Sequence, residues 1–533
     1  MTTAVGGARI LGEGSWYDSG AAALRGAVCV SCATPSFPPR AFCWRCGSET
    51  RPCLLPRSGR VVARSRIRVS PPGFPDTYDV GVVELAGDLR VMVRFQDEAP
   101  DHGAVATVRT GHLRDDETGP VVGPVFAADP AGEPVPSGSR DTGAPDGSVR
   151  PSHGGPLDVT VAGVATTAFG RPDLPAEELA GRAALAAVAD AGLSPHDVDA
   201  VVVGSAFSTA ALGQRMLRHV PWGGRRLVNV ENACASGTSA LAEAVALIRA
   251  GMADVVVAVG ADVPVRSGGG LIALDQDDPV AGIGVTLPAL YALVGDRYRA
   301  TYDVALDAFA EVVVRSRANA VGNEKAFRRG TVSRQEVLAS RPIADPLTLF
   351  QCAPNADGAA AVVVVADHLA GRLPHPPVQI AALGLHTGLT KDRFTGGSVV
   401  QRVARSVYAQ AGIDARDIGV VELHDAFAPA ALTNLEYLGL AEAGTAGHRL
   451  MAGDFAGGST GAMLNPSGGL LSRGHPPGAT GLAQVTELVR QLRGEAGDRQ
   501  LADPGVALLH TMGGTVLELE TNACTIGVLR RVR

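Results

Sequence analysis

A repeat in the C-terminal part of the chain places the strongest constraint on the fold. The segment Asp197–Phe207 (DVDAVVVGSAF) aligns without a gap on Asp417–Phe427 (DIGVVELHDAF), 220 residues further on. Each segment follows an Ala-rich stretch that ends at a glycine, so a helix is expected to finish just before a buried strand begins. Self-similarity of this kind predicts two related halves.

A second correspondence, at an offset of 241 residues, places a cysteine opposite a histidine. Cys234–Gly237 (CASG) aligns with His475–Gly478 (HPPG), and apolar residues of the helices expected behind them also match. If a pseudo-twofold axis relates the two halves, the two helix starts converge on one cleft. The sequence therefore predicts that Cys234 and His475 lie within a few ångströms of each other.

Helix and strand patterns alternate in the same part of the chain. Four segments show this, in chain order: Glu177–Ala191 (helix), Val198–Val203 (strand), Ser236–Arg249 (helix) and Asp254–Val259 (strand). Such alternation is typical of parallel sheets covered by helices. We expect an α/β domain that spans residues 158–533.

The N-terminal part contains two Cys-x2-Cys pairs separated by ten residues. The four cysteines are Cys29, Cys32, Cys43 and Cys46. Four thiolates at this spacing suit a tetrahedral structural zinc ion. Cys53 falls outside the pattern, and we do not expect it to be a ligand.

Short β-branched runs follow the cysteine pairs and are separated by turn residues. They are Arg60–Val69, Tyr78–Leu85, Arg90–Phe95 and Ala104–Val108. Strands of this length and spacing predict a small antiparallel barrel. We therefore expect a zinc-ribbon and OB-fold-like module at residues 1–127. A Pro-, Gly- and Ser-rich flexible linker is expected at 128–157.

Composition excludes several classes of function. The formal net charge is −7 and aromatic residues make up 4%, which disfavours an OB fold that binds nucleic acid. We find neither an apolar run of about 18 residues, the length needed for a membrane helix, nor the regions of a signal peptide near the N-terminus. The expected location is the cytoplasm, without a nucleic-acid or membrane partner.

The surroundings of Cys234 suit a nucleophile. A helix N-terminus lowers the pKa of a thiol, and a neighbouring imidazole can accept its proton. The small residues of Ala233–Gly237 allow a thioester to approach the backbone, whose N–H groups can hold an oxyanion. The alternative is that Cys234 is a small buried apolar residue at a helix start.

Several motifs in the same order are similar to those of the thiolase superfamily. Asn232–Gly237 (NACASG) resembles the nucleophile motif, and Asn465–Gly469 (NPSGG) followed by Gly474–Gly481 (GHPPGATG) resembles the histidine motif. His424–Phe427 (HDAF) resembles the third motif of the sterol-carrier-protein thiolases. This resemblance covers residues from about 158 onward. It implies a five-layered α/β/α/β/α fold, an acyl-CoA substrate, a role in lipid metabolism and a homodimer.

The resemblance also implies roles for individual residues. Cys234 would carry the acyl group, His475 would activate it, and His424 with a water molecule would help to hold the thioester oxygen. His510, in HTMGG, resembles the fourth catalytic loop. The residues expected to contact the substrate are Ser236, Gly237, Ser467, Gly468 and Gly478.

One departure from the family affects the reaction. Thiolases that make or cleave 3-ketoacyl-CoA generally need a second cysteine, and the sterol-carrier type often has it where this chain has Ala426. The last loop offers Met512 in place of a cysteine, whereas Cys524 and Cys352 lie elsewhere. This pattern favours acyl transfer to another nucleophile, or decarboxylative or Friedel–Crafts-like acylation, over ordinary thiolysis.

Three functions remain open from the sequence. The first is an acyl-CoA-dependent acyltransferase or thiolase-like enzyme with a covalent Cys234 intermediate. The second is a retro-aldolase that cleaves a β-hydroxyacyl-CoA, such as a steroid side-chain thioester. It is suggested because residues from about 15 to 125 resemble zinc-ribbon/OB proteins that accompany thiolase-like enzymes. The third is a non-catalytic scaffold that binds acyl-CoA or lipid.

Overall fold

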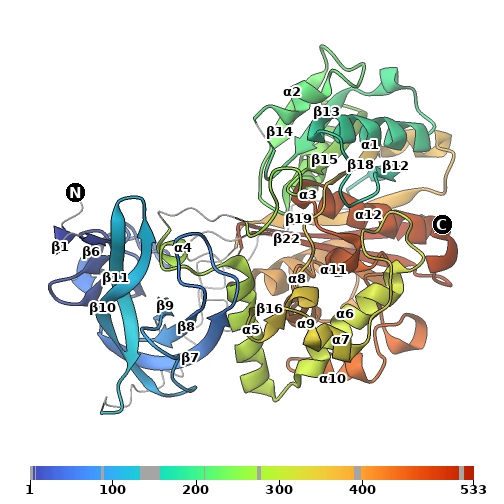
Figure 1. Cartoon of the computed structure of the whole chain (residues 1–533). Coiled ribbons are helices and arrows are strands. Elements are labelled where there is room, and N and C mark those ends of the chain that lie inside the picture. The colour runs from blue at the N-terminus through green and yellow to red at the C-terminus, as the bar shows by residue number, and fades with distance from the viewer. Residues whose placement is uncertain are drawn as a thin grey trace.

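The computed structural model describes residues 4–5, 8–85, 89–131, 157–208, 210–272, 278–388, 398–514 and 521–532. Figure 1 shows the N-terminal strands, in blue, at one side of a larger α/β body that is coloured green to red. The linker expected at 128–157 falls almost entirely outside the described residues, because only 128–131 and 157 are included.

A ten-stranded sheet runs through the α/β body, and its order shows two matching halves. The first half is β14 (Arg226–Val230), β13 (Ala200–Gly204), β15 (Val255–Asp262), β18 (Gly358–Ala366) and β12 (Val159–Thr166). The second half continues as β19 (Val378–His386), β23 (Ala523–Arg531), β22 (Val506–Gly513), β20 (Val420–Glu422) and β21 (Met463–Leu464). The predicted repeat is present, since β13 and β20 hold equivalent places and lie within the two aligned segments.

Strand directions match between the halves, but they differ from the parallel sheets that the sequence predicted. In each half, three strands pair in parallel, namely β14–β13–β15 and β21–β20–β22. The inner pairs, including β15–β18, β22–β23 and the β12–β19 junction, are antiparallel. The sheet is therefore mixed, and a long excursion through residues 263–357 separates β15 from β18 in the chain.

Helices cover both outer faces and fill the layer between the halves. On the outside, α1 (Ala176–Asp190) packs on β12, β15 and β18, and α8 (Val399–Ala411) packs on β19 and β23. Between the halves, α3 (Ser236–Arg249) contacts α12 (Pro477–Arg493). The observed α3 has the predicted bounds, and α1 begins and ends one residue earlier than predicted. All but one residue of α12 is buried, as expected for a central helix.

Among the described residues, the excursion carries four further helices of the α/β body. They are α4 (Pro279–Gly282), α5 (Leu287–Tyr302), α6 (Leu306–Ala320) and α7 (Arg334–Ala339). After β20 come α9 (Ala428–Tyr437), α10 (Ala446–Met451) and α11 (Gly469–Arg473), and a short α2 (Leu212–Met216) follows β13. Among the described helices, none combines the length and apolar character that crossing a membrane requires.

The N-terminal module contains a closed ring of strand pairings. Its strands are β7 (Ser58–Ile67), β8 (Tyr78–Glu84), β9 (Arg90–Arg94), β10 (Val105–Asp116) and β11 (Gly119–Ala128). Antiparallel pairing links β7–β8–β9 and β7–β10–β11, and a bridge between Phe95 and Phe126 closes the ring. The sequence predicted β7 to β10 but missed β11. Assignment of the ring to the OB class stays a prediction.

A separate small sheet carries the cysteine pairs. It consists of β3 (Tyr17–Asp18), β4 (Ala23–Cys29), β5 (Pro35–Ser36) and β6 (Thr50–Leu54). Strands β1 (Ala4–Val5) and β2 (Ala8–Ile10) extend the barrel sheet beyond β11. From the α/β body, β16 (Pro342–Ala344) joins the barrel sheet through the pair Ala344–Ile67, and β17 (Leu347–Thr348) pairs with β16 at the edge of that sheet. The two parts of the chain thus share a sheet.

Candidate active site

Cys234 lies in a tight turn between β14 and α3. The preceding Ala233 has a φ of 47°, a left-handed conformation that is costly for a non-glycine residue. The hydroxyl of Ser236 holds the turn, because it donates to the carbonyl oxygen of Ala233 at 2.6 Å and accepts from the N–H of Asn232 at 2.9 Å. The turn therefore fixes the thiol at the start of α3.

The structure brings Cys234 and His475 into contact, as the repeat predicted. Cys234 Sγ lies 3.2 Å from His475 Nε2. On the other side of the ring, Nδ1 lies 2.7 Å from Thr480 Oγ1, whose hydroxyl donates to the carbonyl oxygen of Pro476. Because a hydroxyl has one hydrogen, Nδ1 is assigned as the donor to Thr480, which leaves Nε2 to accept the thiol proton.

Burial favours the neutral form of this pair. The pKa of Cys234 is raised to about 11 by desolvation, although the backbone N–H groups of Gly514 and of Cys234 itself act in the opposite direction. The pKa of His475 is lowered to about 3, mainly by burial and further by the charge of Arg473. Burial thus outweighs the lowering of the thiol pKa that is expected at a helix start, and at neutral pH the site holds a neutral thiol beside a neutral imidazole.

His424 completes a cluster with these two residues. It follows β20, and its ring lies 5.3 Å from the ring of His475, edge to face at 81°. One ligating atom each from Cys234, His424 and His475 lie within 4.8 Å of one another, and all three residues are buried. Burial and the neighbouring histidines hold the pKa of His424 well below its usual value, so its ring is neutral.

His510 lies behind His424, outside the cluster of three. Its Nδ1 accepts a hydrogen bond of 3.4 Å from the backbone N–H of His424. The residue is fully buried on β22, and burial lowers its pKa to about 3. The structure thus connects His510 to the site through the backbone of His424, and a catalytic role for His510 stays a prediction.

Gly237 and Gly478 allow α3 and α12 to approach closely at their starts. A Cβ atom on Gly237 would lie 2.3 Å from the carbonyl oxygen of Gly478, nearer than such atoms come in proteins. The N–H of Gly478 donates to Asp262 at 2.6 Å. The two glycines therefore hold Cys234 and His475 together, and their contact with substrate, like that of Ser236, stays a prediction.

Ser467 and Gly468 also make contacts within the protein. The hydroxyl of Ser467 donates to Glu422 at 2.8 Å and accepts from Arg473 at 3.1 Å, while the carbonyl oxygen of Gly468 accepts from Ser316. Glu422 and Arg473 form a buried ion pair at 3.4 Å, and burial raises the pKa of Glu422 to about 7. This network supports the loops that bear His424 and His475.

Sequence reasoning missed Asp262. This fully buried carboxylate, at the end of β15, accepts from Ser205 Oγ and from the backbone N–H groups of Ala206, Phe207 and Gly478. It ties the loop after β13 to the start of α12. The available signal was an acidic residue that ends a continuous apolar strand.

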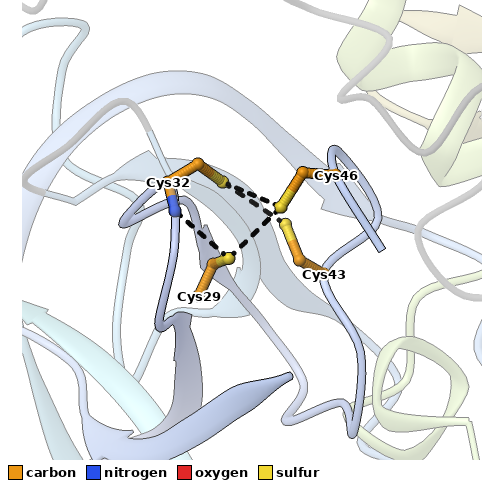
Figure 2. Close-up of side chains that lie close together, drawn as sticks. All are labelled: Cys29, Cys32, Cys43 and Cys46. Carbon is orange, nitrogen blue, oxygen red and sulfur yellow. Dashed lines mark hydrogen bonds between the residues drawn. The ribbon is translucent and has the colours of Figure 1, made fainter. Parts of the chain in front are cut away.

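The four N-terminal cysteines converge as predicted. Figure 2 shows their sulfur atoms facing one another from two turns. The Sγ separations are 3.4 Å for Cys29–Cys46, 3.6 Å for Cys32–Cys43 and 3.5 Å for Cys32–Cys46. Tetrahedral Zn–S bonds of about 2.3 Å place sulfurs about 3.8 Å apart, so the four positions fit a zinc ion. Cys53 is outside this group.

The other cysteines do not join the cluster around Cys234 among the described residues. Cys352 lies opposite Phe427, its thiol donates to the carbonyl oxygen of Thr348 at 3.5 Å, and burial raises its pKa to about 12. Cys524 is fully buried on β23. Ala426 occupies the place where the third motif of the family often has a cysteine, so this site has one thiol.

Family models match most of the chain. "Thiolase, N-terminal domain" matches residues 159–368, "Thiolase C-terminal domain-like" matches 385–524, and "ChsH2, rubredoxin-like zinc ribbon domain" matches 22–50. The last match agrees with the four-cysteine cluster.

The curated relatives include an acetyltransferase, a thiolase subunit and a sterol carrier protein. Acetyl-CoA acetyltransferase of Methanothermobacter thermautotrophicus is 35% identical over 378 residues, which is 67% of this chain and 97% of that protein. Benzoylsuccinyl-CoA thiolase subunit BbsB of Thauera aromatica is 33% identical over 365 residues (67% and 94%). Human sterol carrier protein 2 is 34% identical over 383 residues (67% and 70%).

Solved structures share the fold. The Ltp2-ChsH2(DUF35) aldolase superposes with a TM-score of 0.62 at 28% identity, covering 71% of this chain and 99% of that one. Human mitochondrial 3-ketoacyl-CoA thiolase gives a TM-score of 0.54 at 15% identity, covering 71% and 100%. The second likeness concerns the fold alone, whereas the name of the first structure includes ChsH2, which also names the zinc-ribbon family that matches residues 22–50.

Proposed function

Because this chain belongs to the thiolase superfamily, we propose that it is an acyl-CoA-dependent acyltransferase that carries the acyl group as a thioester on Cys234. One observation supports this above all: Cys234 Sγ lies 3.2 Å from His475 Nε2, which is left as an acceptor by the contact with Thr480. A thiol beside an oriented base is the arrangement that covalent catalysis requires.

The proposed acylation moves one proton and exchanges one thioester for another. Cys234 Sγ attacks the carbonyl carbon of the acyl-CoA while its proton passes to His475 Nε2. We expect the N–H groups of Gly514 and Cys234, which act on Sγ in the resting site, to stabilise the oxyanion. The bond from carbon to the CoA sulfur then breaks, and that sulfur takes the proton from Nε2. An acceptor nucleophile later attacks the Cys234 thioester by the same route.

The single thiol limits which acceptors can take the acyl group in the second half of the reaction. Reversible thiolysis needs an acid/base for the α-carbon, and Ala426 stands where the family often has a cysteine for this step. In the described residues no second thiol reaches the cluster of Cys234, His424 and His475. In ordinary thiolases the second cysteine forms an acetyl-CoA enolate, which accepts the acyl group. We therefore favour transfer of the acyl group to a different acceptor.

Intact-mass spectrometry tests this function. The purified chain, incubated with a panel of short, long and aromatic acyl-CoAs, should gain the mass of one acyl group with at least one of them. The adduct should map to Cys234 and disappear when Cys234 is first alkylated. If binding is detected but no panel member ever leaves an adduct, the chain is a scaffold or a lyase, and the acyltransferase proposal fails.

A second candidate is retro-aldol cleavage of a β-hydroxyacyl-CoA. It is favoured by the similarity to the Ltp2-ChsH2(DUF35) aldolase and by Ala426, because a lyase needs no second thiol. It requires a base for the β-hydroxyl and stabilisation of a thioester enolate, but no covalent sulfur. The Cys234→Ala variant discriminates: if it still splits a β-hydroxyacyl-CoA into a carbonyl compound and a shorter acyl-CoA, the lyase is the correct function.

We propose one structural zinc ion per chain, held by Cys29, Cys32, Cys43 and Cys46. The proposed substrate is a CoA thioester.

We also propose a homodimer through β14, which lies at the edge of the ten-stranded sheet with Val228 39% exposed. An exposed edge strand is a template for pairing with a second copy. Light scattering should then give twice the chain mass of 54.5 kDa. A cytoplasmic location stays a prediction.

A further inference from the structure

The barrel of the N-terminal module and helix α5 share one hydrophobic core. Leu290 and Leu293 of α5 are buried in the same cluster as strand residues such as Val80 and Val93. In Figure 1, α5 lies on the side of the α/β body that faces the blue strands. The barrel therefore packs directly against one side of α5.

Polar contacts fix the same junction. The carboxylate of Asp296, on α5, accepts the backbone N–H of Arg64 at 2.9 Å and lies 3.0 Å from His102 Nε2. Just before α5, the carbonyl oxygen of Gly284 accepts from the hydroxyl of Tyr78 at 2.6 Å. Apolar packing brings α5 into contact with the barrel, and these directional bonds fix the position of the helix there.

The other side of α5 contacts the segment that follows His424. The rings of Tyr291 and Phe427 stack with centroids 4.4 Å apart and planes 21° apart. Gly295, one turn later, faces Pro429, because a Cβ atom on Gly295 would lie 2.9 Å from that ring. Phe427 and Pro429 begin α9, so α5 supports the start of α9.

Helix α9 in turn holds His424. The side-chain amide of Asn434, on α9, donates to the carbonyl oxygen of His424 at 3.2 Å. Phe427 is only three residues from His424, and no residue of this loop is more than partly exposed. A continuous set of contacts thus leads from the barrel through α5 and Tyr291 to the imidazole beside Cys234.

We propose that the N-terminal module is a working part of the active site, which it supports through the stack of Tyr291 on Phe427. Tyr291 is then a positioning residue: its ring fixes Phe427 and α9, and these fix His424. The proposal rests on the proposed function, because His424 matters for catalysis only if it acts on the thioester at Cys234. It makes the module a determinant of rate and not only of solubility or folding.

Three variants of α5 test the role of the stack. Tyr291→Ala should lower the rate of Cys234 acylation by about tenfold, the order expected for losing one aromatic stack. Tyr291→Phe keeps the ring and should restore the rate to within about twofold of the original. Tyr302→Ala removes the same side chain from the same helix at a 41% exposed site and should leave the rate unchanged. Equal losses in Tyr291→Ala and Tyr302→Ala would overturn the proposal.

A double-mutant cycle shows whether Tyr291 acts through His424. In the His424→Ala background, Tyr291→Ala should cause no further loss of acylation rate, whereas full additivity would overturn the proposal. A second readout does not need acylation: in chain labelled at histidine Cε1, the NMR signal of His424 should shift in Tyr291→Ala and not in Tyr302→Ala. An unchanged His424 signal in Tyr291→Ala would contradict the positioning role. If the original chain shows no acylation, only the proposed acyltransferase function is contradicted.

Discussion

Two sulfur sites in this molecule use the same side chain in opposite ways. In the ribbon, four cysteines face one another, with Cys29 and Cys43 buried and Cys32 and Cys46 exposed. In the α/β body, Cys234 stands as the single thiol of its cluster, is 9% exposed and faces an imidazole nitrogen. One site surrounds an ion-sized space with sulfur, and the other pairs one sulfur with a base.

The difference shows that neighbours, and not the thiol itself, decide the chemistry of a cysteine. In the ribbon, backbone N–H groups of the two turns donate to sulfur, for example those of Cys32 and Ser31 to Cys29 at 3.4 Å. Such donors stabilise thiolates that a zinc ion then shares. At Cys234, burial raises the pKa of the thiol and so keeps the proton on sulfur, which lies beside Nε2 of His475.

Removing the thiol from the second site should have the largest effect. Cys234→Ala should abolish the acyl adduct and reduce acyl transfer by at least about 10³-fold, because the covalent step has no other nucleophile. Zinc content, measured by plasma mass spectrometry, should stay at one per chain. If the variant still transfers acyl groups at a substantial rate, Cys234 is not the nucleophile, and the chemical difference proposed between the two sulfur sites is wrong.

Breaking the first site should remove the zinc ion and destabilise the N-terminal module. The Cys29→Ser/Cys46→Ser variant should lose its zinc and the lowest-temperature unfolding transition should move down, since structural zinc supplies about 10–16 kcal/mol of apparent binding energy. Cys53→Ser is the matched control, because Cys53 lies outside the cluster and should keep the metal. Unchanged zinc in the double variant would disprove the ribbon assignment.

The orientation of His475 should matter less than its presence. Thr480→Val keeps the shape of the buried side chain but removes the partner of Nδ1, so the ring loses the contact that leaves Nε2 as the acceptor. We expect acylation to slow by about tenfold, the equivalent of one hydrogen bond of about 1.4 kcal/mol. Thr480→Ser should retain most of the rate. Equal rates in the valine and serine variants would show that Thr480 does not orient the ring.

The smallest effect should come from pH. The pKa of His475 is lowered to about 3, so lowering the pH from 7.5 to 5.5 leaves the base neutral, and the acylation rate should change by less than about twofold. Alkylation of Cys234 by iodoacetamide should instead rise steadily up to high pH, because the pKa of the thiol is raised to about 11. A tenfold fall in acylation across that range, with the midpoint near 6.5, would show that His475 keeps the pKa of an ordinary imidazole and that burial does not lower it.

The sequence was most informative where the fold repeats itself. The offsets of 220 and 241 residues placed Cys234 and His475 at equivalent helix starts, and helix–helix contact in the central layer makes such starts converge. The bounds of α3 followed from an apolar pattern between small residues. The four cysteines were predictable because metal ligation needs a fixed local spacing that leaves a trace in the chain.

Features that depend on contacts between distant segments were not predictable. Thr480 and Asp262 act through hydrogen bonds whose partners are set only when the two halves meet. The Tyr291–Phe427 stack joins a helix of the long excursion to the loop that follows His424, and no periodicity marks it. Strand β11 was missed because Gly and Pro interrupt its alternation at Gly123 and Pro124, although the chain remains extended there.

The sheet shared by β7 and β16 bears on how a gene for such a protein can be arranged. Backbone pairing at Ile67 and Ala344, the ion pair of Arg68 with Asp345 at 2.7 Å and the common core with α5 all connect the two parts independently of the peptide between them. Two separately translated polypeptides with these surfaces would assemble into the same particle. Fusion into one reading frame guarantees equal numbers of the two parts.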